Sequence, residues 1–354
     1  MKKILIVHTG GGLGDVLLST PVIEALAAVF PQARIDFLAR KSTAAAIRSH
    51  PRLQQIMTLD APEPGWSKLF GWVRRLRREK YDIALVLWSK TQLAFMLWLA
   101  GIPIRVGQDS RFSYSWTYTH KVSVRSEHGD VTSHWTQILL DFVRILNPSF
   151  PATRPTFIIP EAAREKAEQL LQGLPDLPGP IIGFHPCKDI KDPLKRWPID
   201  VFAKWVKMLV EQRQARVVIT GGPAEIPLAE KLIELSQVPC LNLAGKTDID
   251  TLAAAAAKCR VFICPDSGPM HLASVCHTPV VGIYALKEDF PKRWAPVDPH
   301  HVSVILSPNA CPRRCIKAHC PDFQCYSQID GQRILDAVDR LLENKSSSAA
   351  AELL

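Results

Sequence analysis

A glycine-rich loop near the start of the chain places the tightest constraint on its fold. The loop is Gly10-Gly11-Gly12-Leu13-Gly14-Asp15, between an apolar run at 4–7 and an apolar segment at 16–26. This order predicts a buried strand, a loop and a helix, where a ligand can approach the backbone and the helix N-terminus. Asp15 suits the dipole at the predicted helix start but repels a phosphate. Because the loop also lacks the dinucleotide and P-loop fingerprints, we interpret Asp15 as a candidate general base, with a structural cap as the alternative.

The rest of the chain alternates short apolar runs with helical patterns, which is typical of a doubly wound parallel sheet. Proline and glycine residues at 175–180 read as a linker between two such series. The sequence therefore predicts an α/β protein with two Rossmann-like domains that face each other across a cleft, with ligands at the carboxyl ends of the strands. The predicted strands are 4–7, 35–39, 55–59, 83–87 and 104–107 in the first series and 181–184, 217–220, 241–243, 261–264 and 280–284 in the second.

Three segments follow from this division. We expect an N-terminal Rossmann-like domain at 1–175, a C-terminal Rossmann-like domain at 176–344 and a disordered tail at 345–354, which is rich in serine and alanine. Helices are expected at 44–47, 92–99, 162–171 and 331–342.

Charge and hydropathy narrow the classes of function. The 354 residues carry a net charge of +9 with an isoelectric point near 9.1, which suits anionic partners. No apolar run reaches the roughly 18 residues of a membrane span. Glycines and Asp15 interrupt the first apolar run, so we interpret it as a strand rather than a signal peptide and expect a cytoplasmic protein.

The loop after the apolar run 261–264 has the most specific pattern of polar residues. It reads Asp266-Ser267-Gly268-Pro269-Met270-His271, and Pro269 favours a helix start there. Ser267 and backbone N–H groups of that helix start can hold a diphosphate, with His271 in the first turn. Lys195 can add a mobile positive charge, and Glu225 can accept hydrogen bonds from ribose hydroxyls.

The ordered set of these motifs resembles glycosyltransferase family nine, the ADP-heptose:lipopolysaccharide heptosyltransferases, from Ile4 to Leu342. The resemblance implies a GT-B fold and inverting transfer of heptose from ADP-heptose to a lipopolysaccharide core precursor, with no cofactor. The matching segments are Gly14 to Pro21, Lys80 to Asp82, Arg105 to Gly107, Lys195 to Pro198, Gly221 to Glu225, Leu243 to Thr247 and Asp266 to His271.

The resemblance implies that the domain at 1–175 binds the acceptor and that the domain at 176–344 binds the nucleotide sugar. It also implies roles for single residues. Asp15 corresponds to the proposed base, Lys195 steadies the diphosphate, and Gly11, Gly12 and Gly14 line the acceptor side. Lys195, His271 and helix N–H groups would replace a metal ion. The remaining donor-binding positions are Glu225 for the nucleoside, Thr247 near adenine, and Asp266, Ser267, Gly268 and His271 for phosphates and sugar.

Two positions depart from the family pattern. Members often have an arginine just before the Gly-Asp pair, where this chain has His8-Thr9-Gly10-Gly11-Gly12, so an acceptor contact is expected to be lost or altered. After His185, where some members have small phosphate-binding hydroxyl residues, this chain has Cys187 and Lys188. Lys188 is therefore a candidate replacement donor-binding residue.

A basic run from Arg74 to Lys80 follows Trp66, Phe70 and Trp72. One interpretation is a solvated helix face. The other is docking on the anionic inner membrane surface or on phosphorylated core sugars, which makes the protein peripheral to that membrane. Nucleic acid is not expected as a partner, because no known nucleic-acid motif accompanies the run.

Cys311, Cys315, Cys320 and Cys325 cluster near the C-terminus with spacing that does not match a zinc ribbon. We expect reduced structural thiols and no metal, with a zinc site or a disulfide as the alternative. Three other functions stay open: transfer of another sugar or to a protein acceptor, a non-catalytic sugar-nucleotide-binding module, and a Rossmann oxidoreductase, which the missing fingerprint disfavours.

Overall fold

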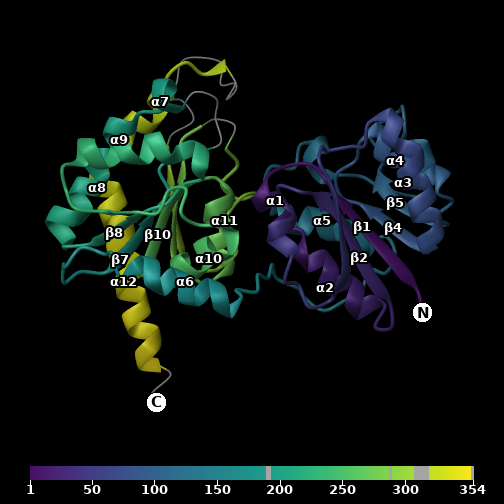
Figure 1. Cartoon of the computed structure of the whole chain (residues 1–354), viewed down its shortest axis with the longest axis horizontal. Helices are drawn as coiled ribbons and strands as arrows, with labels where there is room; N and C mark the ends of the chain where they lie inside the picture. Colours follow the sequence, from purple (N-terminus) through teal and green to yellow (C-terminus); the bar gives the residue numbers. More distant parts are fainter. Residues whose placement is uncertain (189–192, 287–288, 307–318, 352–354) are drawn as a thin grey trace. The chain divides into compact units, whose positions relative to one another are not determined.

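The chain divides into two compact units, Met1–Ile158 and Ile159–Leu354, in a computed structural model that describes residues 1–188, 193–286, 289–306 and 319–351 (Figure 1). The boundary lies earlier than the predicted position at 175/176. Helix α6 (Glu161–Leu171) is the reason, because it packs on α10 (Ile249–Ala257) of the second unit. This contact buries Ala163 and Ala167, so the proline-rich stretch that follows α6 lies inside the second unit.

The first unit is built on one six-stranded sheet in which all neighbouring strands are parallel. The order is β3-β2-β1-β4-β5-β6, which is the Rossmann order. The five predicted strands are confirmed, and β6 was not predicted. The strands are β1 (Lys3–His8), β2 (Arg34–Arg40), β3 (Leu53–Leu59), β4 (Ile83–Val86), β5 (Ile104–Gln108) and β6 (His120–Val122).

Helices cover both faces of this sheet, which explains why its central strands are nearly continuous apolar runs. Leu5 and Val7 of β1 join a core that includes Leu76 of α3 and Leu97 of α4, while α2 and α5 pack against each other on the other face (Figure 1). The helices are α1 (Leu13–Leu17), α2 (Thr20–Val29), α3 (Trp66–Glu79), α4 (Thr91–Leu99) and α5 (Trp135–Arg144), with short 3₁₀ turns η1 (Ala44–Ile47), η2 (Ser115–Thr117) and η3 (Arg125–His128).

The second unit repeats the same architecture. Its parallel sheet has the order β12-β11-β10-β7-β8-β9, which is the order of the first sheet when counting starts at β7. The five predicted strands are again confirmed, and the edge strand β12 was not predicted. The strands are β7 (Ile181–Phe184), β8 (Arg216–Ile219), β9 (Leu241–Asn242), β10 (Val261–Pro265), β11 (Val280–Tyr284) and β12 (His301–Ile305).

Two groups of helices enclose this second sheet. Helix α8 packs on α9 and α12, and α10 packs on α6 and α11. The last helix continues to Ala351, well past the predicted end at Leu342, so the segment expected to be disordered is helical as far as that residue; alanine is the strongest helix former. The helices are α7 (Pro193–Arg196), α8 (Ile199–Arg213), α9 (Ile226–Ser236), α10, α11 (Gly268–Val275) and α12 (Gly331–Ala351), with turns η4 (Pro223–Glu225) and η7 (Gln324–Gln328).

Each sheet has one point where the strand order reverses, between β1 and β4 and between β7 and β10. The loops after these strand pairs turn to opposite faces, which opens a crevice at the carboxyl ends. These two points are where ligand-binding residues are expected in each unit. Among the described helices, none combines the length and apolar character needed to cross a bilayer.

His8 ends β1 and is fully buried beside Trp88, with 6.1 Å between the ring centroids. Among the described residues, neither ring nitrogen of His8 has a hydrogen-bond partner. Burial lowers the pKa of His8 to about 4. Because its pKa in the unfolded chain is near 6.5, the unfolded state binds the proton first as the pH falls.

This burial predicts a pH-dependent stability. His8 stabilises the fold fully above pH 6.5, and the contribution is lost as the pH falls towards 4. The substitution His8→Leu should reduce the difference in unfolding free energy between pH 7 and pH 5 by about 2 kcal/mol. Urea denaturation at the two pH values measures it. The exposed His128, replaced by Gln, is the control; an equal reduction in both variants would contradict the assignment.

Candidate functional site

The glycine loop after β1 is held by Asp15. The Gly12 N–H donates to Asp15 Oδ2 over 2.7 Å, which caps the first turn of α1. Gly11 has φ +64°, and a Cβ there would overlap the Asp15 carboxylate, so the position requires glycine. The Arg40 guanidinium, at the end of β2, donates to the Gly11 carbonyl. The structural-cap interpretation of Asp15 is therefore confirmed, and its role as a base stays a prediction.

The same loop approaches the end of β4 very closely. A Cβ at Gly10 would overlap the indole of Trp88, two residues after β4. This close approach lies where the strand order of the first sheet reverses. Gly11 is half-buried, Gly12 is exposed and Gly14 is buried, so the acceptor-side glycines differ in how much surface they offer.

A cavity of about 520 Å³ lies at the carboxyl ends of β4 and β5. Its buried lining residues are apolar or aromatic, and its exposed lining residues carry hydroxyl or charged groups, a composition typical of small-molecule sites. This cavity was not predicted from the sequence, although Trp88, two residues after β4, and Arg111, three residues after β5, were a signal. Lining residues are Leu87, Trp88, Ser89, Lys90, Thr91, Gln108, Arg111, Ser113, Tyr114, Val124, Ser126, Glu127, Trp135, Ile138, Leu139 and Phe142.

The charged residues of the cavity lining are Lys90, Arg111 and Glu127, and two of them form an ion pair. Arg111 Nη2 donates to Glu127 Oε1 over 2.6 Å, and Lys90 is exposed at the start of α4. Ser89 Oγ and Tyr118 Oη are 3.0 Å apart, and burial raises the pKa of Tyr118, so that phenol stays protonated. Two cations and several hydroxyl groups can therefore contact an anionic, hydroxyl-rich ligand.

The predicted loop after β10 forms the start of α11. Asp266 follows the buried strand, and Ser267 is the N-cap residue, with its hydroxyl 3.1 Å from the Cys264 thiol. Gly268 begins the helix, whose N-terminal N–H groups suit an anion. His271 is 3 % exposed, and its Nε2 lies 3.9 Å from Asp266 Oδ1. The structure thus brings together the four residues that the sequence placed in this loop.

Lys188 joins this loop to the loops after β7 and β11. It is 4 % exposed, and its Nζ lies 2.6 Å from Asp289 Oδ1 and 3.5 Å from Asp266 Oδ2. The other Asp289 oxygen accepts the N–H groups of Ala285 and Leu286 at 3.1 and 3.0 Å. Asp289 was missed in the sequence, because it is 101 residues from Lys188 and belongs to no recognisable motif.

Lys188, Asp266 and Asp289 form what we call the Lys188 triad. Burial and neighbouring charges have opposite effects on the pKa values of Lys188 and Asp289. Burial alone would lower the pKa of Lys188, but the carboxylates of Asp266 and Asp289 outweigh it and raise that pKa above its usual range. Burial also raises the pKa of Asp289, against the effect of the Lys188 ammonium. We conclude that Lys188 is charged and that its ammonium is engaged by protein carboxylates.

A second buried contact links the ends of β7 and β8. His185 is 5 % exposed; its Nδ1 lies 3.2 Å from Thr220 Oγ1, and its Nε2 lies 3.8 Å from Glu225 Oε1. Glu225 Oε2 accepts the Gly222 N–H over 2.6 Å, the same type of cap that Asp15 makes in the first unit. Burial lowers the pKa of His185, so it orients this turn as a neutral ring.

The other predicted donor residues lie outside these contacts. Lys195 is exposed on α7, and Thr247 is half-exposed in the turn before α10. Trp197 anchors the loop that carries Lys195: it is 4 % exposed and lies 4.6 Å, between ring centroids, from Tyr326. Lys195 is thus a solvent-accessible cation on a firmly packed segment.

The C-terminal cysteines are described only in part. Cys311 and Cys315 lie outside the described residues. Cys325 is buried, and the Cys320 carbonyl accepts a hydrogen bond from Arg196 Nε over 2.7 Å. Within the described part of the chain, no group of three histidine, cysteine or acidic side chains has the arrangement of a metal site.

The Lys188 triad predicts a strong dependence of stability on one cation. Lys188→Met leaves two carboxylates without it, one of them almost fully buried, and should lower the free energy of unfolding by about 3–5 kcal/mol. Adding Asp289→Asn should recover part of the loss. The control is Lys258→Met, which breaks an exposed 2.6 Å pair with Glu168 and should cost under about 1 kcal/mol. Equal losses in urea denaturation would show that the triad is not a buried ion network.

Curated relatives carry heptosyltransferase names. Lipooligosaccharide heptosyltransferase 2 of Haemophilus ducreyi is 26 % identical over 294 residues, which are 80 % of this chain and 83 % of that protein. Lipopolysaccharide heptosyltransferase 2 of Escherichia coli K12 is 27 % identical over 293 residues, or 80 % of this chain and 82 % of that protein.

Solved structures have the same fold. A family 9 glycosyltransferase from Veillonella parvula superposes with a TM-score of 0.79 at 22 % identity, covering 97 % of each chain. Escherichia coli ADP-heptose lps heptosyltransferase II superposes with a TM-score of 0.77 at 22 % identity, covering 98 % of this chain and all of that one. These superpositions establish the predicted GT-B fold class. The model of glycosyltransferase family 9 (heptosyltransferase) matches residues 70–323, and the chain therefore belongs to this family of glycosyltransferases.

Proposed function

We propose that this protein transfers a heptose from ADP-heptose to a lipopolysaccharide core acceptor by an inverting single displacement. The observation that carries the proposal is the family match, which spans both units and includes Lys195, Glu225 and the Asp266–His271 loop. The names of the relatives supply the donor and acceptor classes. In such a displacement, the acceptor hydroxyl attacks the anomeric carbon as the nucleoside diphosphate leaves, so one base and charge stabilisation are enough.

The donor diphosphate is placed at the N-terminus of α11. Ser267, Gly268 and the helix N–H groups would contact the phosphates, and the accessible Lys195 would neutralise the leaving group. Glu225 would accept from the ribose and Thr247 would lie near the adenine. The buried pairing of Lys188 supports a role in holding Asp266 rather than direct contact with a phosphate.

The acceptor is assigned to the first unit. The glycine loop lies where the first sheet reverses its order. The cavity of about 520 Å³ lies beside it at the ends of β4 and β5, because Trp88 both lines the cavity and approaches Gly10. Its Lys90 and Arg111 suit an anionic core sugar. Asp15 would take the proton of the attacking hydroxyl. Its cap with Gly12 fixes the orientation of the carboxylate, which is the preorganisation that a general base needs.

A panel of sugar nucleotides tests the proposal. ADP-heptose should be consumed in the presence of a heptose-accepting core oligosaccharide, and the product should have the inverted anomeric configuration by NMR. Transfer of another sugar would contradict the proposed donor, and transfer to a protein would contradict the proposed acceptor. Binding of the nucleotide without turnover would identify a non-catalytic module.

In the same assay, Asp15→Asn should reduce turnover about 10²–10⁴-fold, because the amide cannot take a proton. The amide oxygen can still accept the Gly12 N–H, so the urea midpoint and the affinity for ADP should stay unchanged. Lys195→Ala should show the opposite pattern and weaken ADP binding in calorimetry by about 1.5–3 kcal/mol. If the Asp15→Asn variant keeps wild-type turnover, Asp15 is a structural cap and not a base.

We also propose that α3 docks on the anionic inner membrane surface. Trp66, Phe70, Arg74 and Arg78 are exposed and recur every four residues, so they form one stripe of the helix. Five basic residues and one acidic residue give α3 a net charge of +4. Arg77 donates to the Leu99 carbonyl at the end of α4, which links the stripe to α4.

Aromatic side chains extend this surface. Trp98 of α4 and Trp116 of η2 are 42 % and 53 % exposed and pack edge to face, with ring centroids 5.4 Å apart. Exposed tryptophans beside arginines suit the interface of an anionic bilayer, where the indole enters the headgroup region and the cation meets phosphate.

Charge reversal tests this docking. Arg74→Glu with Arg78→Glu should reduce co-sedimentation with anionic vesicles at low salt, and the difference from wild type should shrink at high salt, because salt screens over about 8–10 Å. Arg164→Glu with Lys166→Glu makes the same charge change on exposed residues of α6 and should have little effect. Equal vesicle binding by both double variants would identify the α3 run as a solvated face.

A further inference from the structure

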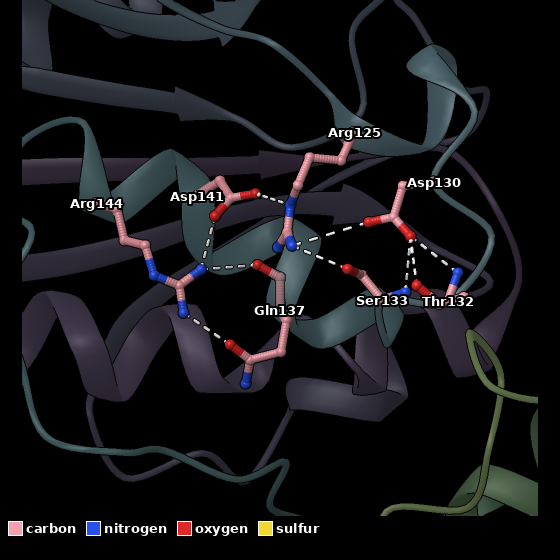
Figure 2. A network of polar contacts seen from close by, with 7 residues as sticks. All are labelled: Arg125, Asp130, Thr132, Ser133, Gln137, Asp141 and Arg144. Carbon is pink, nitrogen blue, oxygen red and sulfur yellow. Dashed lines mark hydrogen bonds and ion pairs between the residues drawn. The ribbon is translucent and has the colours of Figure 1, made fainter.

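One polar network lies behind the cavity of the first unit and outside its lining. Asp141 of α5 accepts from two arginines: Arg125 Nε reaches its Oδ2 over 2.8 Å, and Arg144 Nη1 reaches its Oδ1 over 2.6 Å. Arg125 Nη1 also donates to Ser133 Oγ over 2.9 Å, and Arg144 Nη2 donates to Gln137 Oε1 over 2.7 Å. Figure 2 shows these contacts between α5 and the segment that leads into it. We call Arg125, Asp141 and Arg144 the clamp.

The clamp and the cavity share the same two segments of chain but use opposite sides of them. In the segment 123–127, Val124, Ser126 and Glu127 line the cavity, whereas Ser123 and Arg125 lie on the clamp side. Helix α5 divides in the same way: its cavity-lining residues are Trp135, Ile138, Leu139 and Phe142, and its clamp-side residues are Gln137, Asp141 and Arg144.

The clamp therefore connects to the charged lining of the cavity through two residues of η3. Arg125 is held by Asp141, and Glu127, two residues later in the same turn, accepts from Arg111 over 2.6 Å. Asp130 stabilises the turn between η3 and α5, because its Oδ1 accepts the N–H groups of Thr132 and Ser133 at 2.8 and 2.9 Å. Movement of η3 would displace Glu127 and, with it, Arg111.

We propose that Asp141 is a positioning residue for the acceptor: through Arg125 it fixes η3, so that Glu127 holds Arg111 where an anionic acceptor meets it. This inference rests on the proposed function and adds residues that touch neither substrate. The side chains of Asp141 and Arg125 are 21 % and 41 % exposed, and ion pairs with this exposure contribute little to global stability. Their effect is therefore expected in local geometry rather than in folding.

The substitution Asp141→Asn separates these effects. It keeps the shape of the side chain but removes the charge that holds two guanidinium groups. The KM for the core acceptor should rise about five- to tenfold, while the ADP affinity and the urea midpoint stay unchanged, since a loop misplaced by a fraction of an ångström weakens binding. Arg125→Met should have the same effect, and the double variant should be no worse than either single one, because both act through one contact.

The matched control is Glu168→Gln, which breaks a 2.6 Å ion pair with Lys258 in the second unit and should leave the acceptor KM unchanged. Hydrogen exchange supplies a readout that needs no substrate: the amides of 123–133 should lose protection in Asp141→Asn and keep it in Glu168→Gln.

Unchanged exchange in 123–133, or faster exchange with an unchanged acceptor KM, would overturn the positioning role. Absence of heptose transfer by the wild-type protein would instead overturn the proposed function. Additive effects of Asp141→Asn and Arg125→Met would contradict a single shared contact.

Discussion

Parallel pairing of every strand is the constraint on which both units depend. Two parallel strands need a crossover that brings the chain from the carboxyl end of one strand back to the amino end of the sheet. Each strand is therefore followed by a segment that packs on a face of the sheet. In both units the first strand is central, and the chain later returns to its other side, with β4 beside β1 and β10 beside β7. This arrangement fixes the two places where the loops after neighbouring strands turn to opposite faces of the sheet. The capped glycine loop and the Lys188 triad occur at these points, and the cavity lies next to the first of them, at the ends of β4 and β5.

The fold could be predicted from the sequence because buried parallel strands are almost continuous apolar runs. Lys3–His8 and Val261–Pro265 contain few polar residues, so their pattern was clear. The edge strand His120–Val122 is only three residues long and is followed by polar residues, which leaves no such pattern. The domain boundary was wrong for a related reason: the prolines after α6 are visible in the sequence, but the packing of Ala167 against α10 is a tertiary contact.

The candidate site was predictable where its residues follow a strand directly. Asp15, Glu225 and Asp266 belong to short motifs within a few residues of a strand end, and the structure places them in the first turns beyond the sheets. The pairing of Lys188 with Asp289 was not predictable, because the two residues meet only after β7 and β11 have both paired with β10. The cavity was missed for the same reason: its lining comes from segments spread over 87–142, and only some of the residues of η3 and α5 face it.

The two units also share a local contact, a carboxylate that accepts a glycine N–H, and this contact bears on whether Asp15 can be a catalytic base. Asp15 and Glu225 each accept a glycine N–H three residues earlier, at 2.7 and 2.6 Å. Glycine is needed in the first unit because a side chain at Gly11 would occupy the space of the carboxylate. A carboxylate held in this way has lost most of its rotational freedom before any substrate arrives, so reorienting it in the transition state costs little. A structural cap therefore does not argue against chemistry at Asp15. It supplies the fixed orientation that a base requires, and only a change that keeps the accepting oxygen while removing the basic one can separate the two roles.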